Sequence, residues 1–172
     1  GFTQTLVRYL LKVPEFHDVI FSFHDISEKN LNSVSQLVQK DIDQNKLPAK
    51  IEKSIDRKKS LEGAKYIINC TRIGGLEAYE HDINIPLQYG VDQCVGDTIC
   101  AGGILYGQRN IPQTLNFCRD IKSYSESNAL FLNYSNPMAM NTWAAISEAK
   151  VNTVGLCHGV QGGAKLISKV LG

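Results

Sequence analysis

Short segments of strand-forming residues alternate with segments of helical periodicity along most of the chain, and this alternation limits the possible folds more than any other feature. Strands that alternate with helices pair in parallel and need helices on both faces of the sheet. The sequence therefore predicts an α/β fold built on a parallel sheet. The strand candidates are Asp18–His24, Lys50–Ile55, Lys65–Cys70, Asn128–Tyr134 and Val151–Leu156.

Apolar residues at helical spacing fill most of the segments between these strands. The main exception runs from Gly90 to Gly107, where glycines are frequent and no periodicity is evident, so we expect a functional loop there. The expected helices cover Thr3–Leu11, Ser27–Val38, Glu77–Tyr89, Ile111–Lys122, Met138–Ala149 and Ala164–Val170, with a brief helical turn at Ser60–Ala64.

The composition argues against nucleic-acid and membrane partners. Eighteen Lys and Arg residues are interspersed with 17 Asp and Glu residues, and the formal net charge is only +1. No apolar run reaches the roughly 20 residues that cross a bilayer, and the first residues lack the apolar core of a signal peptide, so we expect a cytoplasmic protein. The five cysteines lack the spacing of a zinc site, and we expect reduced thiols, most of them buried: Cys70, Cys94, Cys100, Cys118 and Cys157.

Four chemically useful residues follow four different strand candidates. Asp25, Gly74, Asn136 and Cys157 each stand at or just beyond a strand's carboxyl end. Ligands of parallel α/β sheets bind at that edge. The agreement of four strand ends therefore predicts one binding site there, and it weighs more than any single motif.

Each of these residues also has an ordinary structural explanation. Asp25 suits an acid that binds the adenosine ribose of NAD, but together with Ser27 it equally suits the start of a helix. Asn136 offers a donor and an acceptor to a sugar hydroxyl, although Asn-Pro is common in turns. Asp97, in the glycine-rich segment, suits substrate contact or proton transfer, but a loop acid is more often solvated.

Cys157 and His158 are adjacent at the end of the last strand candidate. A thiolate suits a soft or borderline metal, and histidine is a common proton donor. Neighbouring side chains on an extended segment point apart, so the two residues suit two separate tasks. The alternative is a core cysteine beside a structural histidine.

Three longer segments resemble one family. NYSNPMAMNTWA (133–144), VGLCHGVQGG (154–163) and YGVDQCVGDTICAGGILYGQRNIP (89–112) are similar to the melibiase-type α-galactosidases of glycoside hydrolase family 4. The resemblance implies NAD- and Mn²⁺-dependent cleavage of α-glycosides, with α-galactosides favoured. In that reaction the sugar C3 hydroxyl is oxidised, the C2 proton is removed, the glycosidic oxygen is eliminated, water adds and C3 is reduced again.

The resemblance also implies residue roles. Cys157 would be a metal ligand, His158 the proton donor to the leaving oxygen and Asn136 a substrate contact, while Asp97 would contact substrate or assist proton transfer. Gly159 stands where melibiases often have serine, so the related α-glucosidase and α-glucuronidase branches stay open, as does a phosphorylated sugar.

The resemblance further implies that residues 1–172 are a fragment of a Rossmann-like NAD-binding domain, truncated at both ends. The chain starts at Gly1 rather than Met, and no glycine-rich turn precedes its first helix. We expect the first strand and that turn to be missing, with Asp25 and Gly74 left as cofactor contacts. The second metal-binding histidine and the catalytic base would lie in an absent C-terminal domain, so the fragment alone would be inactive and the full-length protein a homo-oligomer.

Two other interpretations stay open. An NAD-dependent 2-hydroxy-acid dehydrogenase would share the fold and the role of Asp25, and it would need an arginine such as Arg72 or Arg109 to bind a carboxylate. A non-catalytic truncated paralogue would end at these residues. The dehydrogenase would have no use for Cys157 beside His158.

Overall fold

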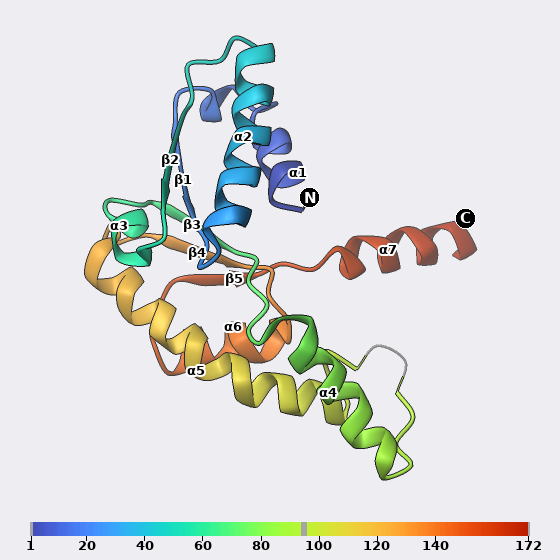
Figure 1. Cartoon of the computed structure of the whole chain (residues 1–172). Helices are drawn as coiled ribbons and strands as arrows, with labels where there is room; N and C mark the ends of the chain where they lie inside the picture. The colour runs from blue at the N-terminus through green and yellow to red at the C-terminus, as the bar shows by residue number, and fades with distance from the viewer. Residues whose placement is uncertain (1, 94–95, 172) are drawn as a thin grey trace. The chain divides into compact units, whose positions relative to one another are not determined.

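The computed structural model describes residues 2–93 and 96–171, so Gly1 and Cys94 lie outside the described residues (Figure 1). All five strand candidates are present, and every pairing between them is parallel, which confirms the α/β prediction. The strands form two sheets rather than one, with orders β1-β2 and β3-β4-β5. The chain correspondingly divides into two compact units, residues 1–64 and 65–172.

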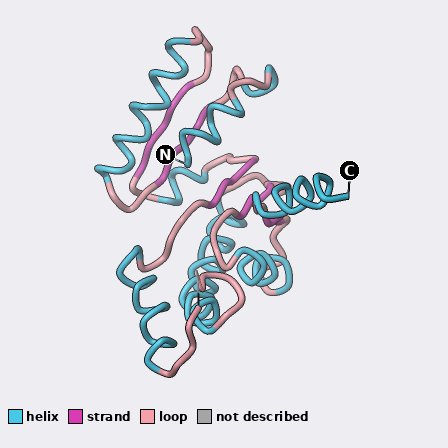
Figure 2. The backbone as a smooth tube through the Cα atoms, turned by 90° about the vertical axis from the view of Figure 1, so that its right-hand side faces the viewer, coloured by secondary structure: helices cyan, strands magenta, loops and turns pink. Residues whose placement is uncertain are grey.

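In the first unit, two parallel strands are packed against helices. Figure 2 shows both strands running alongside the longest helix of this unit, α2. Ser27 caps α2 as predicted, because its Oγ accepts a hydrogen bond from the Asn30 backbone N–H at 3.3 Å. The elements are α1 (Phe2–Leu10), the 3₁₀ helix η1 (Pro14–Phe16), β1 (Ile20–His24), α2 (Glu28–Gln44), β2 (Lys50–Ser54) and α3 (Arg57–Leu61). The core residues are Val7, Leu11, Val38, Ile42 and Ala49.

A bidentate ion pair joins α1 to α2 beside this core. Arg8 Nε and Nη2 each donate to Asp41 at 2.8 Å, and Gln4 Nε2 donates to the same carboxylate at 2.9 Å. The Asp41 carboxylate is buried, whereas the Arg8 side chain is largely exposed. The hydrogen bonds from Arg8 hold the pKa of Asp41 below its usual range.

This lowered pKa predicts a dependence of stability on pH. A carboxyl group with a lowered pKa in the folded state stabilises the fold above its unfolded pKa of about 4, and the contribution is lost as the pH falls through the folded pKa. Between pH 7 and pH 3, we therefore expect the free energy of unfolding, measured in urea, to fall more steeply in the wild type than in Asp41→Asn. Asp43→Asn, on the exposed side of α2, is the control and should follow the wild type; equal slopes for Asp41→Asn and the wild type would contradict the prediction.

The second unit contains three parallel strands and four helices. Asn69 pairs with Asn133 in the register of β3 and β4, and Asn133 pairs with Gly155 in that of β4 and β5. The three carboxyl ends therefore meet at one edge of the sheet. The elements are β3 (Tyr66–Asn69), α4 (Gly75–Gln88), α5 (Ala101–Tyr124), β4 (Leu130–Asn133), α6 (Met138–Ser147), β5 (Thr153–Gly155) and α7 (His158–Leu171).

The expected loop from Gly90 to Gly107 is wrong in its second half, because α5 begins at Ala101. The glycines that suggested a loop lie inside the helix and permit close packing. A Cβ at Gly102 would come within 2.6 Å of the Asp82 carbonyl oxygen, and one at Gly107 within 2.8 Å of Met140 Sδ. Glycine lowers helix propensity, but here close contact with α4 and α6 outweighs that cost.

The last helix also starts earlier than expected. α7 begins at His158 instead of near Ala164, and it extends away from β5 with no buried residue (Figure 1). Across residues 2–93 and 96–171, no helix is both long enough and apolar enough to span a membrane.

Candidate active site

The loops that follow β3 and β4 are held side by side by polar side chains. Asn69 Nδ2 donates to Asn133 Oδ1 at 3.0 Å, and both amides are buried. Two residues beyond these asparagines, Ser135 Oγ donates to the Thr71 carbonyl at 2.8 Å. Because buried amides need partners, these bonds fix the position of both loops where the strands end.

Asn136 and Asp97, which the sequence assigned to the substrate, lie in contact. Asn136 Nδ2 donates to Asp97 Oδ2 at 2.8 Å, and both side chains are half-buried. Asn136 precedes a cis peptide bond to Pro137. The Asn136 amide oxygen and the second Asp97 oxygen make no hydrogen bond with a described residue. These are acceptor groups of the kind that bind sugar hydroxyls.

Gly74 begins α4 in a left-handed conformation, with φ of +84°. A Cβ at this position would also lie 2.5 Å from Ala78 Cβ and 2.9 Å from Arg109 Nε. Glycine is therefore required here both for its backbone conformation and for space. Arg109 Nε donates to the carbonyl of Ile73 at 3.0 Å, so this arginine stabilises the turn that precedes α4.

Arg109 is in turn held by a buried carboxylate. Its Nη1 donates to Asp82 Oδ1 at 3.0 Å and its Nη2 to Asp82 Oδ2, and the Asp82 side chain is only 3% exposed. The bonds to Asp82 raise the pKa of Arg109, so the guanidinium stays charged. From the sequence, Arg109 is a candidate only for binding a dehydrogenase substrate, whereas in the structure its N–H groups donate to Asp82 on α4 and to the carbonyl of Ile73.

Cys157 and His158 follow β5 at the same edge of the sheet. The Leu156 backbone N–H donates to the Asn133 carbonyl at 2.9 Å, which aligns this segment with the end of β4. Cys157 is exposed, and its sulfur accepts a hydrogen bond from the Gly159 N–H at 3.4 Å. His158 is the exposed first residue of α7. The sulfur is thus accessible to a ligand, as a metal-binding role requires.

The prediction that most cysteines are buried is wrong for the described residues. Cys118 is fully buried, and burial raises the pKa of its thiol to about 11. Cys100 is half-buried, while Cys70 and Cys157 are exposed.

The residues that the structure describes do not make a complete metal site. In residues 2–93 and 96–171, no group of three or more His, Cys, Asp or Glu side chains is placed to hold a metal ion. Cys157 is one donor, and manganese prefers oxygen and nitrogen ligands over sulfur. The described residues therefore fit one ligand of a metal site and not a whole site.

Asp25 lies in the first unit and makes the helix-starting contact that was one of its two interpretations. Its Oδ1 accepts a hydrogen bond from the Ser27 N–H at 2.8 Å. Its other carboxylate oxygen makes no hydrogen bond with a described residue. One oxygen is thus used by the fold and one is left for a ligand, so the two roles are compatible.

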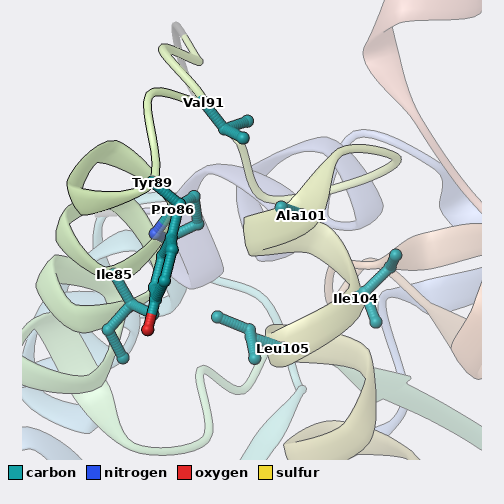
Figure 3. A pocket seen from close by; sticks show the side chains of 7 residues that line it. All are labelled: Ile85, Pro86, Tyr89, Val91, Ala101, Ile104 and Leu105. Carbon is teal, nitrogen blue, oxygen red and sulfur yellow. The ribbon is translucent and has the colours of Figure 1, made fainter.

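A groove of about 320 Å³ lies between α4 and α5 (Figure 3). Its walls are hydrocarbon apart from the Tyr89 hydroxyl, and they hold no acid, base or metal ligand. The groove therefore differs in character from the polar strand edge. Its lining residues are Ile85, Pro86, Tyr89, Val91, Ala101, Ile104 and Leu105.

The Asp82–Arg109 pair is not predicted by the sequence, although one signal for it is present. Asp82 and Pro86 are the two buried residues of α4 and stand four positions apart, so the acid lies on the buried helix face. A buried carboxylate needs a cationic or hydrogen-bonding partner. That reasoning indicates a partner, but the sequence does not show which arginine supplies it.

Comparison with known proteins agrees with this arrangement. The family model described as "Family 4 glycosyl hydrolase" matches residues 1–172. An α-galactosidase of Rhizobium meliloti is 60% identical over the whole of this chain, which spans 35% of that protein. An α-galactosidase of Bacillus subtilis is 35% identical over 88% of the chain and is likewise covered to 35%.

Solved structures show the same fold. The 6-phospho-β-glucosidase of Thermotoga maritima, solved with manganese, NAD⁺ and glucose-6-phosphate, has a TM-score of 0.84 at 26% identity, covering 98% of this chain and 40% of that one. A lactate dehydrogenase from Eimeria maxima, solved with NADH and oxamate, has a TM-score of 0.56 at 17% identity, which shows a shared fold alone. The chain spans 35% of the length of each of the two α-galactosidases named here, and it belongs to the family 4 glycosyl hydrolases.

Proposed function

We propose that this chain is the NAD-binding part of a longer glycosidase that hydrolyses α-galactosides with NAD and Mn²⁺. The observation that carries the proposal is the contact between Asn136 and Asp97 at the strand edge that also bears Cys157 and His158. Identity of 60% to an α-galactosidase over the whole chain favours galactose as the sugar. Relatives named as α-galacturonidases and 6-phospho-β-glucosidases are only 32–36% identical.

The chemistry begins and ends at C3 of the sugar. NAD, when bound, supplies a hydride acceptor for the C3 hydroxyl and later returns that hydride. The C3 ketone acidifies the proton on C2, and removal of that proton lets the glycosidic oxygen leave by elimination. Water then adds across the resulting C1–C2 double bond. This route differs from the two-carboxylate mechanism of most glycosidases.

The residues of this chain would bind the sugar and move protons. Asn136 and Asp97 would accept hydrogen bonds from sugar hydroxyls, and the Asp97 carboxylate would help the catalytic base that lies elsewhere in the longer protein. His158 would donate a proton to the departing oxygen. Asp25, through its free oxygen, and the turn at Gly74 would contact the dinucleotide. Cys157 would be one metal ligand, with the others supplied by substrate and by the longer protein.

The test is hydrolysis of p-nitrophenyl α-galactoside by the complete protein that carries this chain. We expect release of p-nitrophenol to need both NAD and Mn²⁺, to stop after dialysis against a chelator, and to return when both are restored. p-Nitrophenyl β-galactoside is the control for anomer preference. Hydrolysis that continues without NAD and without metal would contradict the proposal, as would failure to cleave any α-glycoside with both present.

A further inference from the structure

A second arginine stands at the polar strand edge, and its donors are not used by the fold. Arg72 follows β3 by three residues, as Asn136 follows β4. The loops that carry Arg72 and Asn136 are bonded to each other, because Ser135 Oγ donates to the Thr71 carbonyl. The Arg72 carbonyl accepts a hydrogen bond from the Gly75 N–H at 3.3 Å, but its guanidinium makes no hydrogen bond or ion pair with any residue of the described ranges 2–93 and 96–171.

The guanidinium of Arg72 is nevertheless held in place by aromatic rings. Its Cζ atom lies 4.8 Å from the centre of the Tyr79 ring, on α4, and 5.6 Å from that of Tyr106, on α5. Rings at these distances attract a cation and restrict a planar guanidinium without using its N–H donors. The guanidinium of Arg72 is thus held in place, and its N–H groups remain available to a ligand.

Comparison with Arg109 makes the difference clear. Arg109 also lies against the Tyr106 ring, at 5.0 Å, but its N–H groups are bonded to Asp82 and to the carbonyl of Ile73. Asp97, the nearest acid assigned to the substrate, is bonded to Asn136 and not to Arg72. An exposed, ordered guanidinium with no anionic partner in its own unit is suited to an anion brought by a ligand.

We propose that Arg72 is an anion-binding residue of the candidate site, in which its guanidinium binds two oxygen atoms of a phosphate or carboxylate carried by a ligand. The inference rests on the proposed function, which brings the diphosphate of the dinucleotide to this edge. A phosphate or carboxylate on the sugar is the other possible source, because relatives of this chain are named as 6-phospho-β-glucosidases and α-galacturonidases. Arg72 would thereby set either cofactor affinity or the preference for charged over neutral sugars.

The test compares Arg72→Gln and Arg72→Lys with the matched control Arg119→Gln, an exposed arginine of α5, in the complete protein. Calorimetry measures the Kd of NAD, and then the Kd values of galacturonate, galactose 6-phosphate and galactose. We expect Arg72→Gln to weaken one of these anions by about tenfold or more, because charge-assisted hydrogen bonds are lost, while neutral galactose changes less than about twofold. Arg72→Lys should recover only part of the loss, because it lacks the planar fork.

The ligand whose Kd changes in Arg72→Gln distinguishes the two sources. A change confined to NAD identifies the diphosphate, and a change confined to the charged sugars identifies the sugar. Equal weakening of charged and neutral ligands, together with a lower melting temperature of the unliganded protein than in Arg119→Gln, would show a structural role and overturn the inference. Unchanged Kd values for every anion would also overturn it. Either result leaves the proposed function standing if the wild type still needs NAD and Mn²⁺ for hydrolysis.

Discussion

Replacing Asp82 by asparagine should destabilise the packing of α4 against α5 by about 3 kcal/mol. The substitution leaves the Arg109 guanidinium, whose side chain is only 27% exposed, without its counter-charge. An amide can accept only one of the two hydrogen bonds that the carboxylate now accepts. The change is large because a buried charge that loses its partner costs more than the pair contributed.

Hydrogen exchange of α4 and α5 amides in the complete protein measures this loss locally. A cost of about 3 kcal/mol corresponds to roughly hundredfold faster exchange of the amides protected by that packing. Asp92→Asn removes an exposed acid from the neighbouring loop and should change exchange very little. Similar exchange rates in the two variants would contradict a stabilising role for the Asp82–Arg109 pair.

Replacing His158 by asparagine should slow the cleavage of alkyl α-galactosides by about 10²- to 10⁴-fold, the usual size of a general-acid contribution. An alkoxide leaves poorly without a proton, whereas p-nitrophenolate is stable as an anion. The same variant should therefore cleave p-nitrophenyl α-galactoside with a much smaller loss. The difference between the two substrates separates proton donation from a general loss of structure.

The kcat values of both substrates, measured with the wild type and the variant, provide the comparison. His81→Asn, which changes an exposed histidine of α4, is the matched control and should leave both values near those of the wild type. An equal loss on the alkyl and nitrophenyl substrates in His158→Asn would assign His158 to binding or folding and would remove it from proton donation.

The fold class could be predicted because strand-forming segments alternate with segments of helical periodicity. β4 is an example, since its segment LFLN is largely apolar, two of its four residues are buried and polar residues follow it. The start of α5 could not be predicted in the same way. Gly102 and Gly107 are typical of a loop in the sequence, but in the structure they lie in a tightly packed helix. Only the contacts with other segments of the chain, such as Asp82 and Met140, show why.

The candidate site could be predicted in part. Residues that follow parallel strands share an edge, so the sequence predicts that Asn136 and Cys157 lie at one edge of the sheet, and β4 and β5 pair in parallel as this requires. The hydrogen bond between Asn136 and Asp97 is not predicted by the sequence. The pairing of Asp82 with Arg109 joins residues 27 positions apart on two helices, and it depends on how those helices pack. The guanidinium of Arg109 is hydrogen-bonded within the fold and that of Arg72 is not, and this difference likewise depends on tertiary contacts.

Location of solvent deuterium in the released sugar tests the central claim most directly. If cleavage proceeds by removal of the C2 proton and later addition of water across C1 and C2, galactose formed in D₂O from a methyl α-galactoside must carry deuterium at C2. Nuclear magnetic resonance of the product from the complete protein, supplied with NAD and Mn²⁺, should show loss of the C2 proton signal in step with turnover. Galactose that retains its C2 proton would contradict elimination and, with it, the function proposed for this chain.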